Sequence, residues 1–123
     1  LKPGRTSSLV ELVDLFPTLS AAAGLETPEG LHGTSLFPIL RDPDAQVKQS
    51  ALSIHGSGTS MRTANWTYTR YKDGSEELYD MTNDPEQFTN RARVKKSEQA
   101  LAIQRRAFDK RLRAAGLKPT KIR

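Results

Sequence analysis

Residues 60–80 read SMRTANWTYTRYKDGSEELYD, and this stretch decides the fold. Side chains alternate along residues 66–71, so that Trp66, Tyr68 and Arg70 share one face of a strand and the residues between them share the other. Two dipeptides, Ala64–Asn65 and Asp73–Gly74, suit tight hairpin turns. The stretch therefore predicts antiparallel strands over residues 60–63, 66–71 and 77–80.

The segments on either side of this stretch extend the pattern. Residues 51–55, ALSIH, predict a further strand, which is followed by a flexible loop at 56–58. Residues 83–86, NDPE, are typical of a turn that starts a helix. A long helix is predicted from Ser97, its expected cap, to a stop at Gly116. Its apolar face repeats at helical spacing and consists of Leu101, Phe108, Leu112 and Ala115.

The N-terminal segment, positions 1–48, predicts a strand that enters a helix. Residues 8–13 form the expected strand, Asp14 is a suitable helix cap, and Gly24 is a natural stop. A second short helix is expected over residues 36–40. It should end before Pro43, because the residue before a proline avoids the helical conformation. The predicted fold class is therefore α+β, with a small antiparallel sheet of three to four strands packed with a long C-terminal helix and preceded by a strand–helix segment.

Composition and charge exclude several classes of protein. The chain has no Cys, which removes disulfides, thiolate metal sites and cysteine nucleophiles. Its formal net charge is +5, but eleven basic residues lie in residues 93–123 and face only Glu98 and Asp109, so the rest of the chain is net acidic. No apolar run reaches the roughly 18 residues that a membrane span needs. The chain opens without Met inside an apparent loop, and we expect a piece of a longer protein.

The chain lacks the residues for catalysis on its own. It has two His, at positions 32 and 55, and no HExxH, G-x-S-x-G, P-loop or G-x-G-x-x-G motif. We expect His32 to be an ordinary loop histidine. Asp14, Asp80 and Asp84 lie in contexts typical of caps and turns rather than of metal ligands. No catalytic and no metal-binding residue is predicted.

Two residues are candidates for binding a ligand. His55 ends a predicted strand beside a glycine loop, which is where sheets often carry functional side chains. Arg62 suits the recognition of sulfate, phosphate or carboxylate, although pairing with Asp80 or Glu76 across the sheet is the favoured interpretation from the residues alone. The aromatic residues of the strands and the basic helix leave open a different function, a small module that binds nucleic acid or another polyanion.

Four blocks in a constant order resemble the late part of a type I sulfatase. They cover most of residues 2–92, and their sequences are most similar to those of the iduronate-2-sulfatase-like branch. Each block is short and together they are specific: KPG at 2–4 with LVDLFPTL at 12–19 and AGL at 23–25, EGLHGTSL at 29–36, SMRT at 60–63 with WTYTRY at 66–71, and ELYD at 77–80 with NDPE at 83–86 and TN at 89–90.

The resemblance implies an enzyme of the alkaline-phosphatase superfamily that hydrolyses sulfate esters. It implies a large N-terminal α/β domain, to whose end residues 1–48 would belong, and a C-terminal subdomain over 49–116 with a tail at 117–123. Family members use a formylglycine made within a C/S-x-P-x-R motif and a calcium ion. This sequence has neither that motif nor the metal-binding aspartates, so both groups are expected in the N-terminal domain that precedes it, and the chain alone is expected to be inert.

In the family, loops of the C-terminal subdomain reach the mouth of the active site, and here this would be the segment 55–62. His55 and Arg62 are therefore expected to contact the substrate, a sulfated carbohydrate, in the intact enzyme. The missing domain is the expected partner, with neither nucleic acid nor membrane, and the location is periplasmic or extracellular. The apolar face of residues 9–19 would be left uncovered and could form a non-native dimer. A third interpretation is a protein-interaction domain that has lost its enzyme.

Overall fold

The computed structural model describes residues 3–119 and 122. Contacts divide the chain into two compact units, one up to Ala51 and one from Leu52 onward, and each is described by itself. None of the helices in the described residues is long and apolar enough to cross a membrane. In chain order the elements are the 3-10 turn η1 (Leu12–Asp14), α1 (Leu15–Ala22), α2 (Phe37–Arg41), β1 (Ala51–His55), β2 (Gly58–Arg62), β3 (Trp66–Tyr71), β4 (Glu76–Asp80), the 3-10 turn η2 (Lys95–Ser97) and α3 (Glu98–Ala114).

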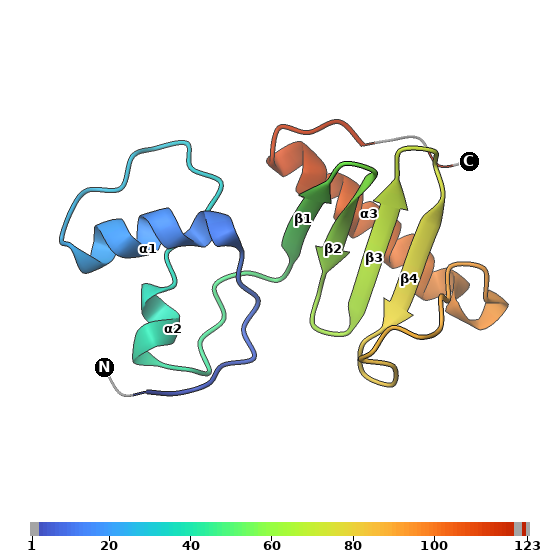
Figure 1. Ribbon diagram of the computed structural model, residues 1–123, viewed down its shortest axis with the longest axis horizontal. Helices are drawn as coiled ribbons and strands as arrows, with labels where there is room; N and C mark the ends of the chain where they lie inside the picture. The colour runs from blue at the N-terminus through green and yellow to red at the C-terminus, as the bar shows by residue number, and fades with distance from the viewer. Residues whose placement is uncertain (1–2, 120–121, 123) are drawn as a thin grey trace. The chain divides into compact units, whose positions relative to one another are not determined.

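The C-terminal unit is a four-stranded sheet with the order β1-β2-β3-β4, covered on one face by α3 (Figure 1). The pairs β2–β3 and β3–β4 are antiparallel, as the two hairpin signals predicted. In their register Met61 lies opposite Tyr68, and Tyr68 lies opposite Leu78. These three side chains therefore form one row across the sheet, and all three are fully buried.

Helix α3 supplies the other half of this core. Its buried apolar residues Leu101, Phe108 and Leu112 pack against the row on the sheet. Phe108 meets Tyr68 edge to face, with ring centroids 5.1 Å apart, a favourable arrangement for two aromatic rings. The helix ends before Gly116, which has a positive φ, the left-handed conformation that glycine adopts easily. The predicted strands, helix and apolar face are thus confirmed, as is the α+β class.

The N-terminal unit has a much smaller apolar core. Ile39 of α2 is the one large hydrophobic side chain among its described residues that is buried. The predicted stop of α1 at Gly24 is confirmed by the positive φ of this glycine and by a hydrogen bond from the Leu25 N–H to the Ser20 carbonyl at 2.9 Å. Gly33 allows a close approach, because a Cβ there would lie 2.0 Å from the Val13 carbonyl oxygen.

Two predicted elements are wrong. Residues 8–13 do not form a strand, because no other strand among the described residues of this unit offers a pairing edge, and residues 12–14 instead turn into η1. Residues 83–86 do not start a helix. The Asp84 carboxylate accepts a hydrogen bond from the Phe88 N–H at 3.0 Å and another from the Thr89 N–H at 2.8 Å. Gln87 has a positive φ, which a right-handed helix cannot continue.

The ends of the predicted domains are located as follows. The boundary between the two units follows Ala51, the first residue of β1, and is three residues after the predicted boundary at 48. Residues 117–119 have no regular secondary structure, and residues 120, 121 and 123 of the predicted tail lie outside the described residues.

Candidate functional site

His55 is the last residue of β1, and its side chain is exposed at the β1–β2 turn. Its Nδ1 lies 3.1 Å from the Ser57 hydroxyl, and its ring meets Tyr71 edge-on at 6.1 Å between centroids. Gly58 permits this arrangement, since a Cβ there would lie 2.7 Å from the Arg70 carbonyl oxygen and 3.1 Å from the Tyr71 ring. The glycine loop thus brings an imidazole and a phenol together at one end of the sheet.

Arg62 is the last residue of β2 and lies directly opposite Thr67. It is half-buried, and one guanidinium nitrogen donates to the Thr67 hydroxyl at 3.3 Å. Burial lowers the pKa of Arg62. Among residues 3–119 and 122, no carboxylate forms an ion pair with it, so the expected pairing with Asp80 or Glu76 is wrong. A partly desolvated cation that retains its charge is suited to an anionic ligand.

Both candidates belong to the face of the sheet that points away from the α3 side. Tyr71 and Thr67 alternate with the core residue Tyr68 and therefore lie on the opposite face. We call this surface the polar face, and its members from β2, β3 and β4 are Ser60, Arg62, Thr67, Thr69, Tyr71, Glu77 and Tyr79.

Hydrogen bonds across the strands order the polar face. The Ser60 and Thr69 hydroxyls lie 2.9 Å apart, and the Tyr71 hydroxyl donates to Glu77 at 3.0 Å. Burial and then the neighbouring Glu77 carboxylate raise the pKa of Tyr71, and the same two causes raise that of Tyr79. Both phenols therefore stay protonated near neutral pH and serve as hydrogen-bond donors.

The structure does not bring His55 and Arg62 together. His55 lies beside Tyr71, which is opposite Gly58 at one end of β2, whereas Arg62 is at the other end. Four residues of strand separate those ends, or roughly 13 Å. The two side chains can contact one extended ligand at separate points but not one small anion. Their role in substrate binding stays a prediction.

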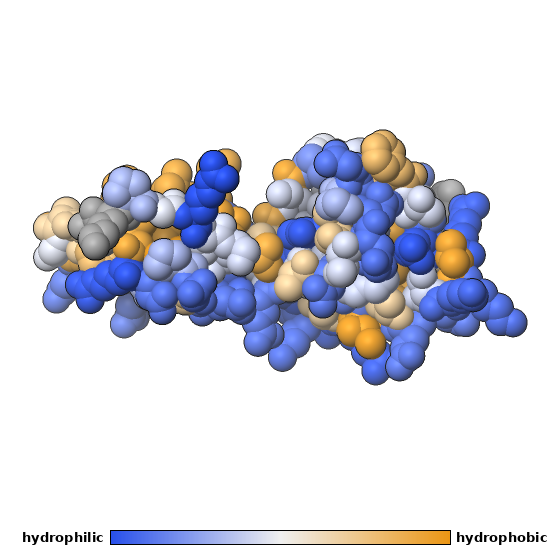
Figure 2. Space-filling model, turned by 90° about the horizontal axis from the view of Figure 1, so that it is seen from below, coloured by the Kyte–Doolittle hydropathy of each residue, from blue (hydrophilic) through white to orange (hydrophobic). Residues whose placement is uncertain are grey.

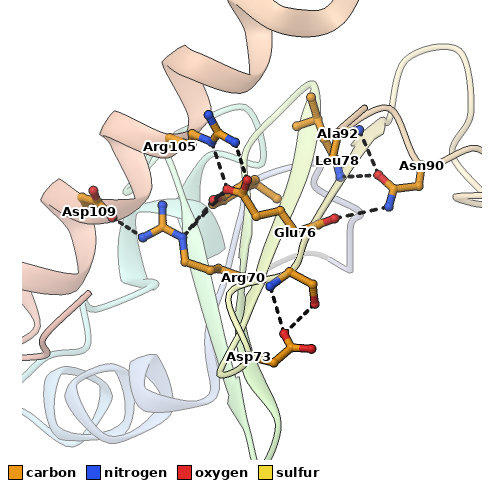
Figure 3. Close-up of polar contacts among 10 residues, drawn as sticks. Arg70, Asp73, Glu76, Leu78, Asn90, Ala92, Arg105 and Asp109 are labelled. Carbon is orange, nitrogen blue, oxygen red and sulfur yellow. Dashed lines mark hydrogen bonds and ion pairs between the residues drawn. The ribbon is translucent and has the colours of Figure 1, made fainter. Parts of the chain in front are cut away.

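On the α3 side of the sheet, a buried ionic cluster was missed by the sequence analysis (Figure 3). Arg70 is 3% exposed and donates to Asp109 of α3 at 2.7 Å and to the Tyr68 hydroxyl at 3.0 Å. Glu76 accepts hydrogen bonds from Arg105 of α3 and from the Tyr68 hydroxyl. The predicted hairpin at Asp73–Gly74 brings β3 and β4 together, but only the observed register places Arg70 directly opposite Glu76.

This cluster ties α3 to β3 and β4, and its carboxylates are held in ion pairs. Burial alone raises the pKa of Glu76, but the hydrogen bond from Arg105 and that from Tyr68 outweigh it, and the net shift is downward. Burial and the same hydrogen bond to Glu76 raise the pKa of Tyr68. A carboxylate that is charged, buried and fully hydrogen-bonded is a poor general base.

Asn90 fixes the segment after β4 to the edge of the sheet (Figure 3). Its side-chain oxygen accepts from the Leu78 N–H at 3.1 Å and from the Ala92 N–H at 2.9 Å. Its amide nitrogen donates to the Glu76 carbonyl at 3.3 Å. The irregular segment before α3 is therefore held by this side chain together with a backbone hydrogen bond from the Arg91 N–H to the Leu78 carbonyl at 2.7 Å.

Asp80 and Asp84 have the turn contacts that the sequence indicated, whereas the predicted cap at Asp14 is wrong, because its side chain makes no hydrogen bond to the first turn of α1. Asp14 is fully buried and accepts from Lys48 at 2.6 Å and from the Thr34 and Glu11 N–H groups. Burial raises the pKa of Asp14, but the Lys48 ammonium and these N–H groups outweigh it, so the pKa lies below its usual value. No group of three or more His, Asp or Glu side chains that could hold a metal ion is found in the described residues.

Comparison with known proteins shows what the chain is similar to. No family model matches the chain. Sulfatase sequences and structures do match it, and they support the resemblance to the C-terminal part of a sulfatase. The chain is therefore similar to the C-terminal part of these sulfatases.

The particular matches agree with one another. Arylsulfatase K of Xenopus laevis is 32% identical over 108 residues, which are 73% of this chain and 20% of that protein. A putative sulfatase from Bacteroides thetaiotaomicron has a TM-score of 0.77 at 33% identity, over 84% of this chain and 24% of the other. A structure described as a 2-O GAG sulfatase has a TM-score of 0.75 at 34% identity over the same shares. The chain spans about a fifth of the length of the curated relatives it matches.

Proposed function

We propose that this chain is the C-terminal part of a sulfatase that hydrolyses sulfate esters of carbohydrate. The observation that carries the proposal is the match to sulfatase structures over 84% of the chain at 33% identity and a TM-score of 0.77. The chain alone is inert, because the family's nucleophile motif is absent from its sequence. A nucleic-acid-binding module is not favoured, since the matches described above are all to sulfatases.

The substrate class is a glycosaminoglycan or related sugar with a 2-O-sulfate, as in the iduronate-2-sulfatase-like branch. Two observations support this choice. The four sequence blocks resemble those of that branch, and the chain is 34% identical to a structure described as a 2-O GAG sulfatase. Within this function the polar face forms one wall of the substrate cleft. Arg62 binds a sulfate or carboxylate of the sugar chain, and His55 binds a second polar group of it.

Calcium and formylglycine belong to the N-terminal domain of the parent enzyme in this proposal. Residues 3–119 and 122 do not gather a ligand set for a metal ion, so no step of the reaction is assigned to them. The protein is exported to the periplasm or the exterior. That location suits an enzyme whose substrate is a polysaccharide.

The parent domain also covers the apolar surface of the N-terminal unit. Figure 2 shows hydrophobic surface on this part of the chain. We call it the α1 apolar surface, and its exposed members are Leu12, Val13, Leu15, Phe16, Leu19 and Leu25. An apolar surface of this kind is typical of an interface. In the isolated chain a second copy covers it instead, as a non-native dimer.

The test uses the longer protein that contains this chain. Its reading frame is expected to encode a C/S-x-P-x-R motif, and the protein is expected to release sulfate from 2-O-sulfated disaccharides in preference to 6-O-sulfated ones. The isolated chain serves as the inert control. If the longer protein releases sulfate from no ester, the proposed function fails. If it prefers 6-O-sulfates, the branch is wrong and the sulfatase class stands.

The cleft wall is tested by a second comparison. Arg62→Ala is expected to raise KM about tenfold with kcat within twofold, because a lost charged contact costs about 1.5–3 kcal/mol. Arg62→Lys should recover part of the loss. Arg41→Ala is the matched control, since Arg41 stacks on Phe37 in the N-terminal unit. An unchanged KM for Arg62→Ala would exclude the residue from substrate binding.

A further inference from the structure

Helix α3 carries a row of cations that its packing on the sheet does not use. The buried stripe of the helix, Leu101, Gln104, Phe108 and Leu112, faces the sheet. Arg105 and Asp109, at the border of the stripe, bind Glu76 and Arg70. Another row follows at spacings of four, three, four and three residues, and all its members are exposed: Gln99, Ile103, Arg106, Lys110 and Arg113. We call it the α3 outer row.

The three cations of this row are not neutralised within the part of the chain that the structure describes. Arg106, Lys110 and Arg113 form no ion pair with any residue among 3–119 and 122. Asp109 is the acid that could screen them, but its carboxylate is bound to Arg70 at 2.7 Å. Like charges three and four residues apart on a helix repel one another. The row therefore weakens the isolated helix, and an external anion would relieve the repulsion.

The geometry of the row suits a linear polyanion. With a rise of about 1.5 Å per residue, the three cations lie along roughly 10 Å of the helix axis at intervals of roughly 5–6 Å. Two of the three are Arg, whose planar guanidinium binds sulfate and carboxylate through two parallel hydrogen bonds. Ile103 and Gln99 continue the row and offer an apolar contact and an amide. A sugar ring has both an apolar face and hydroxyl groups that match them.

The surroundings add positive charge and no aromatic stacking platform. Three more exposed cations, Arg93, Lys95 and Lys96, lie on the segment that leads into α3. The outer row itself contains no aromatic residue, whereas sequence-tolerant binding of single-stranded nucleic acid relies on aromatic side chains that stack on bases. Phe108 of the same helix is buried and faces the sheet.

We propose that the α3 outer row is a binding site for a sulfated polysaccharide chain, held through Arg106, Lys110 and Arg113. The choice of a sulfated sugar rests on the proposed function, whereas the site rests on the row alone. Sulfate groups along the polymer bind the three cations, and a sugar ring packs on Ile103. The site holds the polymer without any chemical step, so its binding is measurable on the isolated chain itself.

The experiment compares two variants that each lose two Arg and one Lys. The row variant is Arg106→Gln/Lys110→Gln/Arg113→Gln, in which glutamine preserves helix propensity. The control variant is Arg5→Gln/Arg41→Gln/Lys72→Gln, which removes the same net charge from exposed positions elsewhere. Affinity for heparin, for desulfated heparin and for single-stranded DNA is titrated at several salt concentrations, including about 0.15 M, a physiological ionic strength.

The row variant is expected to bind heparin at least tenfold more weakly than the unmodified chain, with a shallower dependence on salt. The control variant should stay within about twofold. Arg106→Lys/Arg113→Lys keeps the charges and should retain most of the affinity. Circular dichroism and thermal unfolding check the fold of each variant, and the row variant is expected to melt no lower, because self-repulsion on the helix is removed.

Four results would overturn the proposal. Equal weakening in the row and control variants would show that heparin senses net charge alone. Equal affinity for desulfated heparin, or tighter binding of DNA through the same row, would make the ligand class wrong. No binding of heparin at physiological ionic strength would remove the site. Failure of the longer protein to release sulfate would defeat the proposed function and leave these measurements unaffected.

Discussion

Each of the two units of this chain is stabilised internally by a different kind of interaction. The C-terminal unit has a core of six buried apolar side chains shared by the sheet and α3. The N-terminal unit buries Ile39 as its one large hydrophobic residue among those described, and its central buried group is the charged cluster of Asp14, Glu11 and Lys48. The C-terminal unit therefore folds around its own apolar core, whereas the N-terminal unit leaves most of its large apolar side chains exposed.

In the proposed function, this difference means that the C-terminal unit is a subdomain with its own core and the N-terminal unit is a component of the large domain of the parent enzyme. Hydrophobic burial is the main favourable term in folding, so a unit that leaves most of its large apolar side chains exposed gains little of it. The exposed α1 apolar surface and the buried ionic cluster therefore both reflect how little apolar area the N-terminal unit buries. The predictions below break or sharpen this contrast.

The largest effect is expected for Phe108→Ala. This ring is 1% exposed and packs against Tyr68, so its loss removes buried area and leaves a cavity in the core of the C-terminal unit. The free energy of unfolding should fall by about 4 kcal/mol in urea denaturation. Ile39→Ala, the corresponding change in the N-terminal unit, should leave the unfolding of the C-terminal unit unchanged. Equal effects of the two substitutions on that transition would contradict the separate cores.

The next effect is expected for Lys48→Met, which removes the cation from the N-terminal cluster. The Asp14 carboxylate would stay buried without its ammonium partner at 2.6 Å. Losing one member of a buried pair costs about 3 kcal/mol. Amide hydrogen exchange should accelerate over residues 11–48 and stay slow in β3 and α3. The double variant Lys48→Met/Asp14→Leu should recover part of the protection, and a slow N-terminal unit in the single variant would refute the role of the pair.

The structure of the C-terminal unit was predicted from the sequence better than that of the N-terminal unit, for a physical reason. Strand alternation and the two hairpin dipeptides predicted β3 with its observed bounds, because pairing partners lie within a few residues along the chain. Residues 8–13 have strand-like composition, but a strand forms only where a neighbouring edge exists, and none is present among the described residues of their unit. Local sequence cannot report a partner that lies outside it.

The candidate site divides in the same way. Arg62 and His55 could be singled out from residue type and position at strand ends, and the structure shows them at opposite ends of the polar face. The Arg70–Glu76 pair could not be predicted from the dipeptide, since a two-residue turn at Asp73–Gly74 would place Arg70 opposite Glu77, whereas the observed register places it opposite Glu76. The contacts of Arg70 with Asp109 and of Glu76 with Arg105 could not be predicted either, because they depend on how α3 is rotated on the sheet.

A smaller effect is expected for the acid sensitivity of the C-terminal unit. The folded-state pKa of Glu76 lies below its usual value of 4.5. Its contribution to stability is therefore fully present above that pH and is lost as the pH falls through the lowered pKa. Glu76→Gln should cost about 2 kcal/mol at neutral pH and flatten the acid side of the stability profile. Glu77→Gln is the control on the polar face. Parallel acid profiles for Glu76→Gln and the unmodified chain would contradict the assignment.

The smallest change in folding stability, with the clearest change in association, is expected for the α1 apolar surface. Leu12 and Leu19 are 87% and 66% exposed, and the matched controls Phe88 and Ile54 in the other unit are 85% and 65% exposed. The unmodified chain is expected to sediment as a dimer and the Leu12→Ser/Leu19→Ser variant to sediment closer to a monomer. The free energy of unfolding should change by no more than about 0.5 kcal/mol. Phe88→Ser/Ile54→Ser should leave the association unchanged, because Ile54 lies on β1 and Phe88 on the segment after β4, outside the α1 apolar surface. A chain that sediments as a monomer at every concentration would show that the α1 apolar surface can remain hydrated, and the N-terminal unit would then need no other surface to complete it.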